Sequence, residues 1–242
     1  MSSRALVLIN PGARRAGEGR EAIVGRLKVL GIHLVLEVAP VPEEVADRVR
    51  RHRQEVDAVI VVGGDGTLNL ALQGLVETGL PLGIIPLGTA NNLARTIGIP
   101  ADPLEACGVI AQGQRRRIDL GWVNGRYFFT TASIGLSVRI TEELSAERRR
   151  RWGPPAIDDA RLDLYSLEVR HWWQLLALAP AIKRGRQGGK SRVESLRATE
   201  FEIHTRTPRG IDVDGEIGGT TPARCRLLPR ALEVFAPLPR MA

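Results

Sequence analysis

Short strands that alternate with helices are the feature that most constrains the fold of this chain. The first half contains four strand patterns, most of them continuous apolar runs, at residues 5–9, 33–38, 58–62 and 82–85. Helical patterns lie between and after them, at residues 18–30, 42–53, 67–76, 91–97 and 102–112. A short apolar run is typical of a strand that is buried on both faces, as in parallel sheets. The alternation therefore predicts an α/β domain in which helices cover a parallel sheet.

The second half has a different pattern. Strand patterns dominate it, at residues 117–123, 127–131, 163–169, 198–205 and 231–237. Helical patterns occur only at residues 138–151 and 171–184. Strand-rich sequence with turn residues between the strands predicts an antiparallel, β-sandwich-like domain. We therefore expect an α/β domain at residues 1–117 and a strand-rich domain at residues 118–242, whose final strand is a candidate to return to the first domain.

Composition narrows the class of protein. Of the 242 residues, 43% are hydrophobic and 25% are charged, which is typical of a globular chain. Aromatic residues make up only 4%, which argues against a platform for stacking bases, so we expect no nucleic-acid partner. The two cysteines, Cys107 and Cys225, fit a reducing compartment such as the cytoplasm. No apolar run is long enough to span a membrane, and the net charge of +7 fits a solvated surface or an anionic lipid surface.

A glycine-rich turn between a buried strand and a helix is the first candidate binding site. The strand at residues 58–62 runs directly into Gly63, Gly64, Asp65 and Gly66. Such a turn leaves backbone N–H groups at a helix N-terminus, and glycine lets a phosphate approach the backbone closely. A tight turn without a ligand explains one or two glycines. It does not explain the aspartate, which would repel phosphate unless a metal or a reacting hydroxyl intervened.

Two further loops are expected at the same edge of the sheet. Residues 86–95 also follow a strand and open a helix, with Thr89 as the expected N-cap. Asn10 and Pro11 follow the first strand. Ordinary helix capping would explain residues 86–95 alone. However, all three loops follow parallel strands, so they converge at the carboxyl edge, where ligands of such folds bind.

These three loops, in this order, resemble the nucleotide-binding signature of the diacylglycerol kinase catalytic-domain family, which includes bacterial lipid kinases and the sphingosine and ceramide kinases. The matching segments are Asn10-Pro11, residues 63–69 and residues 86–91. The glycine element alone is less specific, because NAD kinases and phosphofructokinases carry similar strings. The resemblance continues at residues 119–121, 129–135, 158–163 and 213–216, so it covers nearly the whole chain.

The resemblance implies a set of site residues. The ATP-binding residues would be Asn10, Pro11, Gly63, Gly64, Asp65, Gly66, Thr67, Leu68, Asn69, Thr89 and Asn91. Asp214 or Glu216 would take the proton from a lipid hydroxyl, while Asp65 would manage phosphate charge with Mg²⁺ or serve as the base instead. Asp159 matches a metal-binding aspartate of the family, where Mg²⁺ is structural. Without the resemblance, Asp214-Gly215 predicts only a hairpin turn.

Three departures from the family pattern bear on the second domain and the site. Leu70 stands where the family usually has an acid, and Ala160 replaces the usual glycine. Several dozen family residues are missing between Gly153 and Pro154, which predicts a shortened lipid-facing domain. Because missing strands leave open sheet edges, we expect self-association, such as a homodimer, or lipid binding there, together with low kinase activity.

The sequence therefore predicts an ATP-dependent lipid kinase that acts on diacylglycerol or a related lipid at a membrane surface. Its expected location is the cytoplasm, with peripheral membrane association. Two alternatives stay open. One is a soluble-substrate kinase that resembles NAD kinase, and the other is a non-catalytic nucleotide- or lipid-binding relative.

Overall fold

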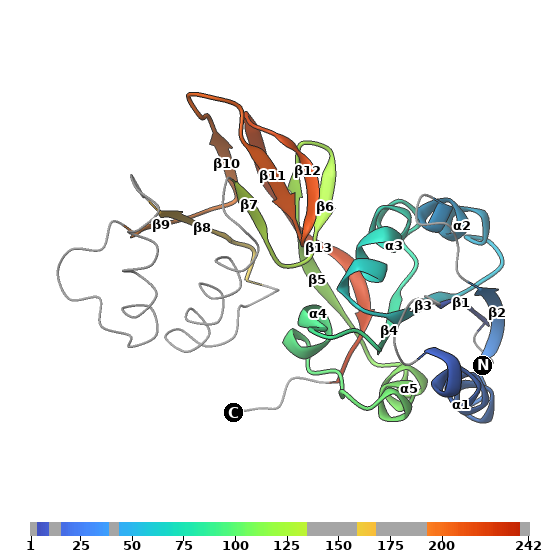
Figure 1. The fold of residues 1–242 in the computed structure, drawn as a ribbon. Coiled ribbons are helices and arrows are strands. Elements are labelled where there is room, and N and C mark those ends of the chain that lie inside the picture. Colours follow the sequence, from blue (N-terminus) through green and yellow to red (C-terminus); the bar gives the residue numbers. More distant parts are fainter. Residues whose placement is uncertain (1–3, 10–15, 39–43, 135–158, 168–192, 238–242) are drawn as a thin grey trace.

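The structure is a computed structural model that describes residues 4–9, 16–38, 44–134, 159–167 and 193–237 (Figure 1). Its main sheet begins with four parallel strands, in the order β2-β1-β3-β4. Their bounds are β1 Arg4–Ile9, β2 His33–Val38, β3 Ala58–Gly63 and β4 Leu82–Pro86. Every residue of β3 and β4 is buried, as expected for strands covered on both faces. The predicted parallel α/β half is confirmed.

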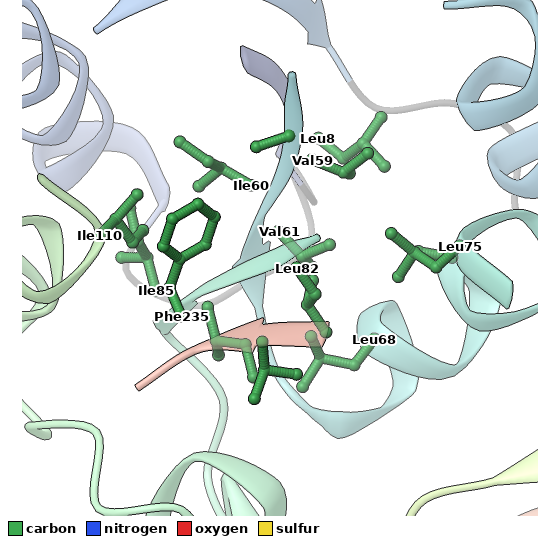
Figure 2. Packing of buried hydrophobic residues seen from close by; sticks show 14 of the residues in the cluster. Leu8, Val59, Ile60, Val61, Leu68, Leu75, Leu82, Ile85, Ile110 and Phe235 are labelled. Carbon is green, nitrogen blue, oxygen red and sulfur yellow. The ribbon is translucent and has the colours of Figure 1, made fainter. Parts of the chain in front are cut away.

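Five helices accompany this sheet in the described residues: α1 Ala16–Val29, α2 Val45–Arg51, α3 Asp65–Thr78, α4 Asn92–Thr96 and α5 Pro103–Gln112. Helices α2 and α3 pack together on one side of the strands, and α1 and α5 pack together on the other (Figure 1). The core lies between them, where Ile60, Leu82 and Leu68 are fully buried (Figure 2). Helix α3 begins at Asp65, two residues before the predicted start.

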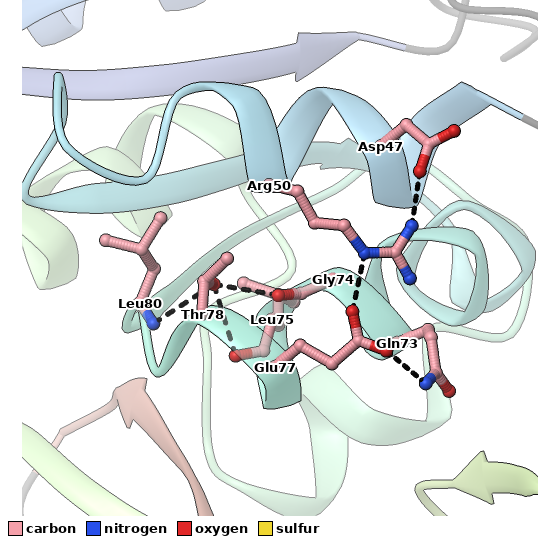
Figure 3. Close-up of polar contacts among 8 residues, drawn as sticks. All are labelled: Asp47, Arg50, Gln73, Gly74, Leu75, Glu77, Thr78 and Leu80. Carbon is pink, nitrogen blue, oxygen red and sulfur yellow. Dashed lines mark hydrogen bonds and ion pairs between the residues drawn. The ribbon is translucent and has the colours of Figure 1, made fainter.

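A close contact joins α2 to α3. A Cβ atom built on Gly74 would lie 2.6 Å from the Ala46 carbonyl oxygen, so only glycine allows this approach. At the exposed rim of the contact, Arg50 Nε donates to Glu77 Oε2 at 2.5 Å, and Arg50 also pairs with Asp47 (Figure 3). Ion pairs this exposed contribute little. The stable position of α3 therefore comes mainly from its buried face.

The second half is built from antiparallel strands. A three-stranded sheet has the order β12-β11-β7, and a separate pair joins β8 to β9. The bounds are β7 Ala132–Ile134, β8 Leu162–Leu167, β9 Val193–Ala198, β11 Gly210–Val213 and β12 Glu216–Thr220. A small core of Val123, Phe128, Ile211, Val213 and Ala223 lies here. The predicted antiparallel, strand-rich second half is confirmed.

Two long strands connect the halves. Strand β13, Ala223–Phe235, pairs in parallel with β4 through Val234 and Leu82, and in antiparallel fashion with β5, Arg115–Val123. The sheet continues through β6, Arg126–Phe128, while β10, Glu200–Ile203, also pairs with β13. The final strand thus reaches the first sheet. The predicted boundary between residues 117 and 118 falls inside β5, and it stays a prediction.

Several sequence expectations differ in detail or fall outside the described residues. The strand predicted at residues 198–205 corresponds to β10, which is shorter, and the preceding strand β9 ends at Ala198. The helices predicted at residues 138–151 and 171–184 lie outside the described residues, as does the junction of Gly153 and Pro154. Among the helices that the structure describes, none has the length and apolar character of a membrane span.

Candidate nucleotide loop and the Asp214 turn

The glycine turn after β3 leads straight into α3. Gly64 is the N-cap residue in an extended conformation, with φ −105° and ψ −171°, and the helix ladder starts where Leu68 N donates to Gly64 O at 3.1 Å. The first turn of an α-helix has amide groups without an intrahelical acceptor. These amides and the positive end of the helix dipole favour an anion at this point.

The glycines at this site serve a contact between two loops. A Cβ atom on Gly64 would lie 2.9 Å from Gly88 Cα, and one on Gly88 would lie 2.5 Å from Gly64 Cα. Leu87 N also donates to Gly63 O at 2.9 Å. The loops after β3 and β4 therefore pack backbone to backbone. Around Gly66, by contrast, no described residue other than its chain neighbours and the backbone of its own helix comes within 4 Å of a built Cβ atom, so the space beside the first turn of α3 is open.

Asp65 has a structural role that the sequence analysis did not foresee. Its Oδ2 accepts from Asn92 N at 3.0 Å, and its Oδ1 accepts from Leu93 N at 3.3 Å. The carboxylate of one loop therefore caps the helix that begins in the other. This contact explains an acid between glycines without a metal, so the inference that a tight turn could not account for it was wrong. The catalytic role of Asp65 stays a prediction.

Asn91, rather than Thr89, occupies the N-cap position of α4. Asn91 has the left-handed conformation, with φ 47°, and its side chain bonds to Gly88: Oδ1 accepts from Gly88 N at 3.0 Å, and Nδ2 donates to Gly88 O at 2.7 Å. Thr89 is exposed. The prediction that Thr89 caps the helix was therefore wrong, because Asn91 folds the loop and Asp65 supplies the cap.

The other predicted ATP contacts are placed differently from one another. Leu68 is 1% exposed and packs in the core, so its side chain holds α3 on the sheet. Thr67 is buried beside Gly63, and Asn69 is half-buried. Asn10 and Pro11 lie outside the described residues. Their roles as ATP contacts stay predictions.

The Asp214 turn joins β11 to β12. Val213 pairs with Glu216, and both residues between them have positive φ, 49° at Asp214 and 94° at Gly215. This is the geometry of a two-residue type I′ hairpin turn, which favours Asp-Gly. Asp212 Oδ1 accepts from Gly215 N at 3.0 Å and braces the turn.

Hydrogen bonds fix the Asp214 carboxylate against residues 129–131. Oδ2 accepts from Phe129 N at 2.7 Å, while Oδ1 accepts from Thr131 N at 2.9 Å and from both Thr130 N and Thr130 Oγ1, at 3.1 and 2.7 Å. Burial raises the pKa of Asp214 above its ordinary value, and the four donors offset only part of that rise. Glu216 is exposed, and no described residue is bonded to its carboxylate.

Asp119 organises the region around Asp159. Buried in β5, it accepts from Ala160 N at 2.8 Å through Oδ2 and from Arg230 N at 2.7 Å through Oδ1. Both donors have positive φ, 55° at Ala160 and 51° at Arg230, which explains why glycine would suit residue 160. Asp159 is exposed and accepts from Arg161 N at 3.2 Å. Within the described ranges, no group of three or more His, Cys, Asp or Glu side chains is placed to hold a metal.

Comparison with known proteins places both halves of the chain. A sequence model of the diacylglycerol kinase catalytic domain matches residues 4–123, and a model of the YegS C-terminal NAD kinase beta sandwich-like domain matches residues 136–236. Residues 4–123 belong to the diacylglycerol kinase catalytic-domain family. The chain therefore carries the catalytic domain of an enzyme family, and the family resemblance predicted from the loops is confirmed.

Individual relatives agree with this family. A diacylglycerol kinase from Staphylococcus saprophyticus is 26% identical over an alignment of 251 positions, gaps included, which covers 81% of this chain and 82% of that protein. A YegS-like lipid kinase from Chromohalobacter salexigens is 38% identical over 155 residues, covering 61% of this chain and 49% of that protein. The crystal structure of a diacylglycerol kinase from Bacillus anthracis has a TM-score of 0.78 at 21% identity, over 98% of this chain and 97% of that one. The last likeness shows the fold.

One alignment compares the length of this chain with that of a relative. A diacylglycerol kinase from Staphylococcus aureus aligns over 295 positions, which include 98% of this chain and 93% of that protein, at 26% identity. This chain has only 242 residues. The relative therefore carries residues that have no counterpart here, and the location of the shortening between Gly153 and Pro154 stays a prediction.

Proposed function

We propose that this protein is an ATP-dependent lipid kinase, which transfers the γ-phosphoryl group to a hydroxyl of diacylglycerol or a related lipid. The observation that carries the proposal is the pairing of two sites in one chain of this family. One is the glycine turn at the start of α3, and the other is the desolvated Asp214 turn. The glycine turn suits a bound phosphate, and the Asp214 turn provides a carboxylate that can accept the proton of a neutral hydroxyl.

The geometry of the glycine turn fits a nucleotide. The space beside Gly66 is open, and the first-turn amides of α3 face an anion favourably. Asp65 would repel phosphate if its charge pointed there, but both of its oxygens accept from amides of α4. In this proposal Asp65 positions the two loops, and Asn10, Pro11, Asn69, Thr89 and Asn91 complete the nucleotide contacts.

Magnesium enters the proposal with the nucleotide. Mg²⁺ binds phosphate oxygens and keeps most of its waters, so it needs few protein ligands, and it would neutralise phosphate charge. The described side chains provide no dedicated cluster for it. Asp159 stays a candidate ligand for a structural ion, and we assign no step of the reaction to that ion.

The lipid hydroxyl that receives the phosphate needs a base, and this base must be a carboxylate oxygen with a free lone pair. Among the described residues, three donors bond to Asp214 Oδ1, whereas Oδ2 receives one hydrogen bond, from Phe129 N. Oδ2 is therefore the atom that would take the proton of the lipid hydroxyl. A raised pKa strengthens Asp214 as a base. Glu216, exposed on the same turn, is the alternative base.

Because the proposed substrate is a lipid, the enzyme would act at a membrane surface. It would reach that surface from the cytoplasm and associate with it peripherally. The net charge of +7 would favour an anionic bilayer. A self-associated form, such as a homodimer, is compatible with the open edges of β8 and β9, since no other described strand pairs with either.

Transfer of label from γ-labelled ATP tests the proposal. Wild-type protein is incubated with Mg²⁺ and either a panel of lipid alcohols in detergent micelles or NAD, and Asp214→Asn serves as the catalytic control. We expect a labelled lipid that is absent with Asp214→Asn. Labelled NAD would support the soluble-substrate kinase instead, and ATP binding without any transfer would support a non-catalytic relative.

A further inference from the structure

Three side chains form a row across the sheet that carries the Asp214 turn. Asp212 on β11 pairs with Ile217 on β12 and with Ser133 on β7. Directly opposed residues of antiparallel strands project from the same face. Ile211, Val213 and the residues flanking Ser133 contribute to the small core on the other face. We name Ile217, Asp212 and Ser133 the lipid row.

Ser133 is the member that most needs a ligand. It is only 8% exposed, and its Oγ has no hydrogen-bond partner among the described residues. A buried hydroxyl without a partner is costly and uncommon in folded proteins. Removing such a hydroxyl should be neutral or stabilising if it serves the fold alone. A ligand that carries a hydroxyl would satisfy Ser133, and no described residue does.

The other two members limit what that partner can be. Ile217 is 84% exposed on an edge strand, so it offers apolar surface to a ligand. Asp212 is half-buried, and in the part of the chain that the structure describes only its Oδ1 is engaged, by Gly215 N. The carboxylates of Asp214 and Glu216 lie on the adjoining turn. This concentration of negative charge disfavours a phosphate and favours a neutral molecule that has a hydroxyl and an apolar part.

We propose that the lipid row holds the lipid alcohol, with Asp212 and Ser133 on its hydroxyl-bearing end and Ile217 against its acyl chains. This inference rests on the proposed function and adds the residues that select the acceptor. Asp212 accepts from the turn that carries Asp214, so a hydroxyl bound to Asp212 lies beside the proposed base. Selection then follows from chemistry: a neutral lipid alcohol matches all three side chains, and a water-soluble anion matches none of them.

Ser133→Ala is the first test. The variant removes only the hydroxyl, so its melting temperature should equal or exceed that of wild type. The KM for dioleoylglycerol in mixed micelles should rise about tenfold, while the KM for ATP stays unchanged. An unchanged KM for the lipid together with an unchanged or raised melting temperature would show that the hydroxyl serves no ligand.

Ile217→Thr tests the apolar end, with Val29→Thr as its matched control. Val29, in α1, is 80% exposed and far along the chain from the turn. Ile217→Thr should raise the KM for dioleoylglycerol several-fold more than the KM for the short-chain dihexanoylglycerol. Val29→Thr should leave both unchanged. Equal behaviour of the two variants would overturn the assignment of Ile217.

The outcomes separate this inference from the proposed function. If wild-type protein phosphorylates no lipid, the proposed function fails first. If it phosphorylates dioleoylglycerol while Ser133→Ala and Ile217→Thr keep the wild-type KM, the kinase stands and the lipid row is wrong. A change in sedimentation mass with Ile217→Thr, without a change in KM, would assign the edge to self-association and would also overturn the inference.

Discussion

The dipeptide Asp-Gly occurs at both halves of the candidate site, and the two copies fold differently. Asp65-Gly66 begins a helix, whereas Asp214-Gly215 forms a hairpin turn with positive φ at both residues. Both aspartates accept hydrogen bonds from backbone N–H groups of a distant segment. Asp65 accepts them from the start of α4, and Asp214 accepts them from residues 129–131. Each carboxylate thus fastens one loop to another.

The difference lies in what the surroundings do to each acid. Asp65 receives two hydrogen bonds, both from the helix that it caps. Asp214 receives four, and its burial raises its pKa. The role of an Asp-Gly motif therefore depends on its surroundings. We expect Asp65 to matter chiefly for loop geometry and stability, and Asp214 chiefly for turnover.

The largest expected effect is that of Asp214→Asn on the chemical step. The variant keeps the size of the side chain and loses the base, so kcat should fall about 10²- to 10⁴-fold. Steady-state transfer of phosphate to dioleoylglycerol measures it. Glu216→Gln is the matched control on the same turn. If Glu216→Gln shows the large loss and Asp214→Asn does not, the base is Glu216.

Gly64→Val should have the next largest effect, on nucleotide binding. Its side chain would collide with the Gly88 backbone, so the loops would separate at a cost of about 1–3 kcal/mol. ATP binding by calorimetry should be lost. Gly66→Ala is the control in the same turn. Its Cβ atom would meet no described residue outside its own helix and chain neighbours, and alanine favours a helix more than glycine does, so Gly66→Ala should raise stability by about 1 kcal/mol. It should weaken ATP binding only as far as the added Cβ atom crowds the bound phosphate.

The pH dependence of stability should distinguish the two aspartates. Because the pKa of Asp214 is raised on folding, the folded state binds this proton more tightly than the unfolded chain does. Protonated Asp214 therefore stabilises the folded state. This contribution is fully present below the pKa of Asp214 in the unfolded chain, about 3.9, and it is lost as the pH rises through the pKa of Asp214 in the folded state. Urea unfolding at a series of pH values should show this loss in wild type. The same series on Asp214→Asn should lack it, and an identical pH profile would contradict the account.

Asp65→Ala should lower stability modestly. It removes the cap of α4, which costs about 1 kcal/mol in typical helices. The urea midpoint of the purified protein measures the change. A loss of kcat as large as that of Asp214→Asn, with stability unchanged, would show that Asp65 acts on the reacting atoms and would break the comparison.

Ala160→Gly should have the smallest effect, and it should be stabilising. Ala160 has φ 55°, which disfavours a residue with a Cβ atom. Glycine removes that strain but adds freedom to the unfolded chain, so the net gain is about 0.5–1 kcal/mol. The unfolding midpoint of the variant should rise. A fall would show that the contact of Ala160 with Asp119 tolerates no extra freedom.

Local patterns explain how much of the fold was predictable. The parallel sheet follows from apolar runs such as residues 58–62, and the glycine loops follow from their place after those runs. Strand β13 was predicted at less than its full length, because Pro229 and Arg230 interrupt the pattern at a register shift between Leu228 and Leu232. A proline normally argues against a strand interior, and a bulge accommodates it here.

Long-range contacts explain what the sequence could not reveal at the site. Asp65 caps a helix whose first amides lie 27 and 28 residues further along the chain. Asp119 is bonded to residues 41 and 111 positions away. No local spacing encodes such partners. Two signals marked Asp119: residues 119–121 belong to the family resemblance, and an acid within a largely apolar strand pattern indicates a buried carboxylate that needs donors.

In the proposed function, the turn at α3 holds the nucleotide and the Asp214 turn takes the proton. ATP binding and phosphate transfer, measured side by side on Gly64→Val and Asp214→Asn, test it most directly. We expect Gly64→Val to lose both activities, while Asp214→Asn binds ATP with wild-type affinity and transfers almost no phosphate to lipid. Transfer at the wild-type rate by Asp214→Asn, or loss of its ATP binding, would contradict the account.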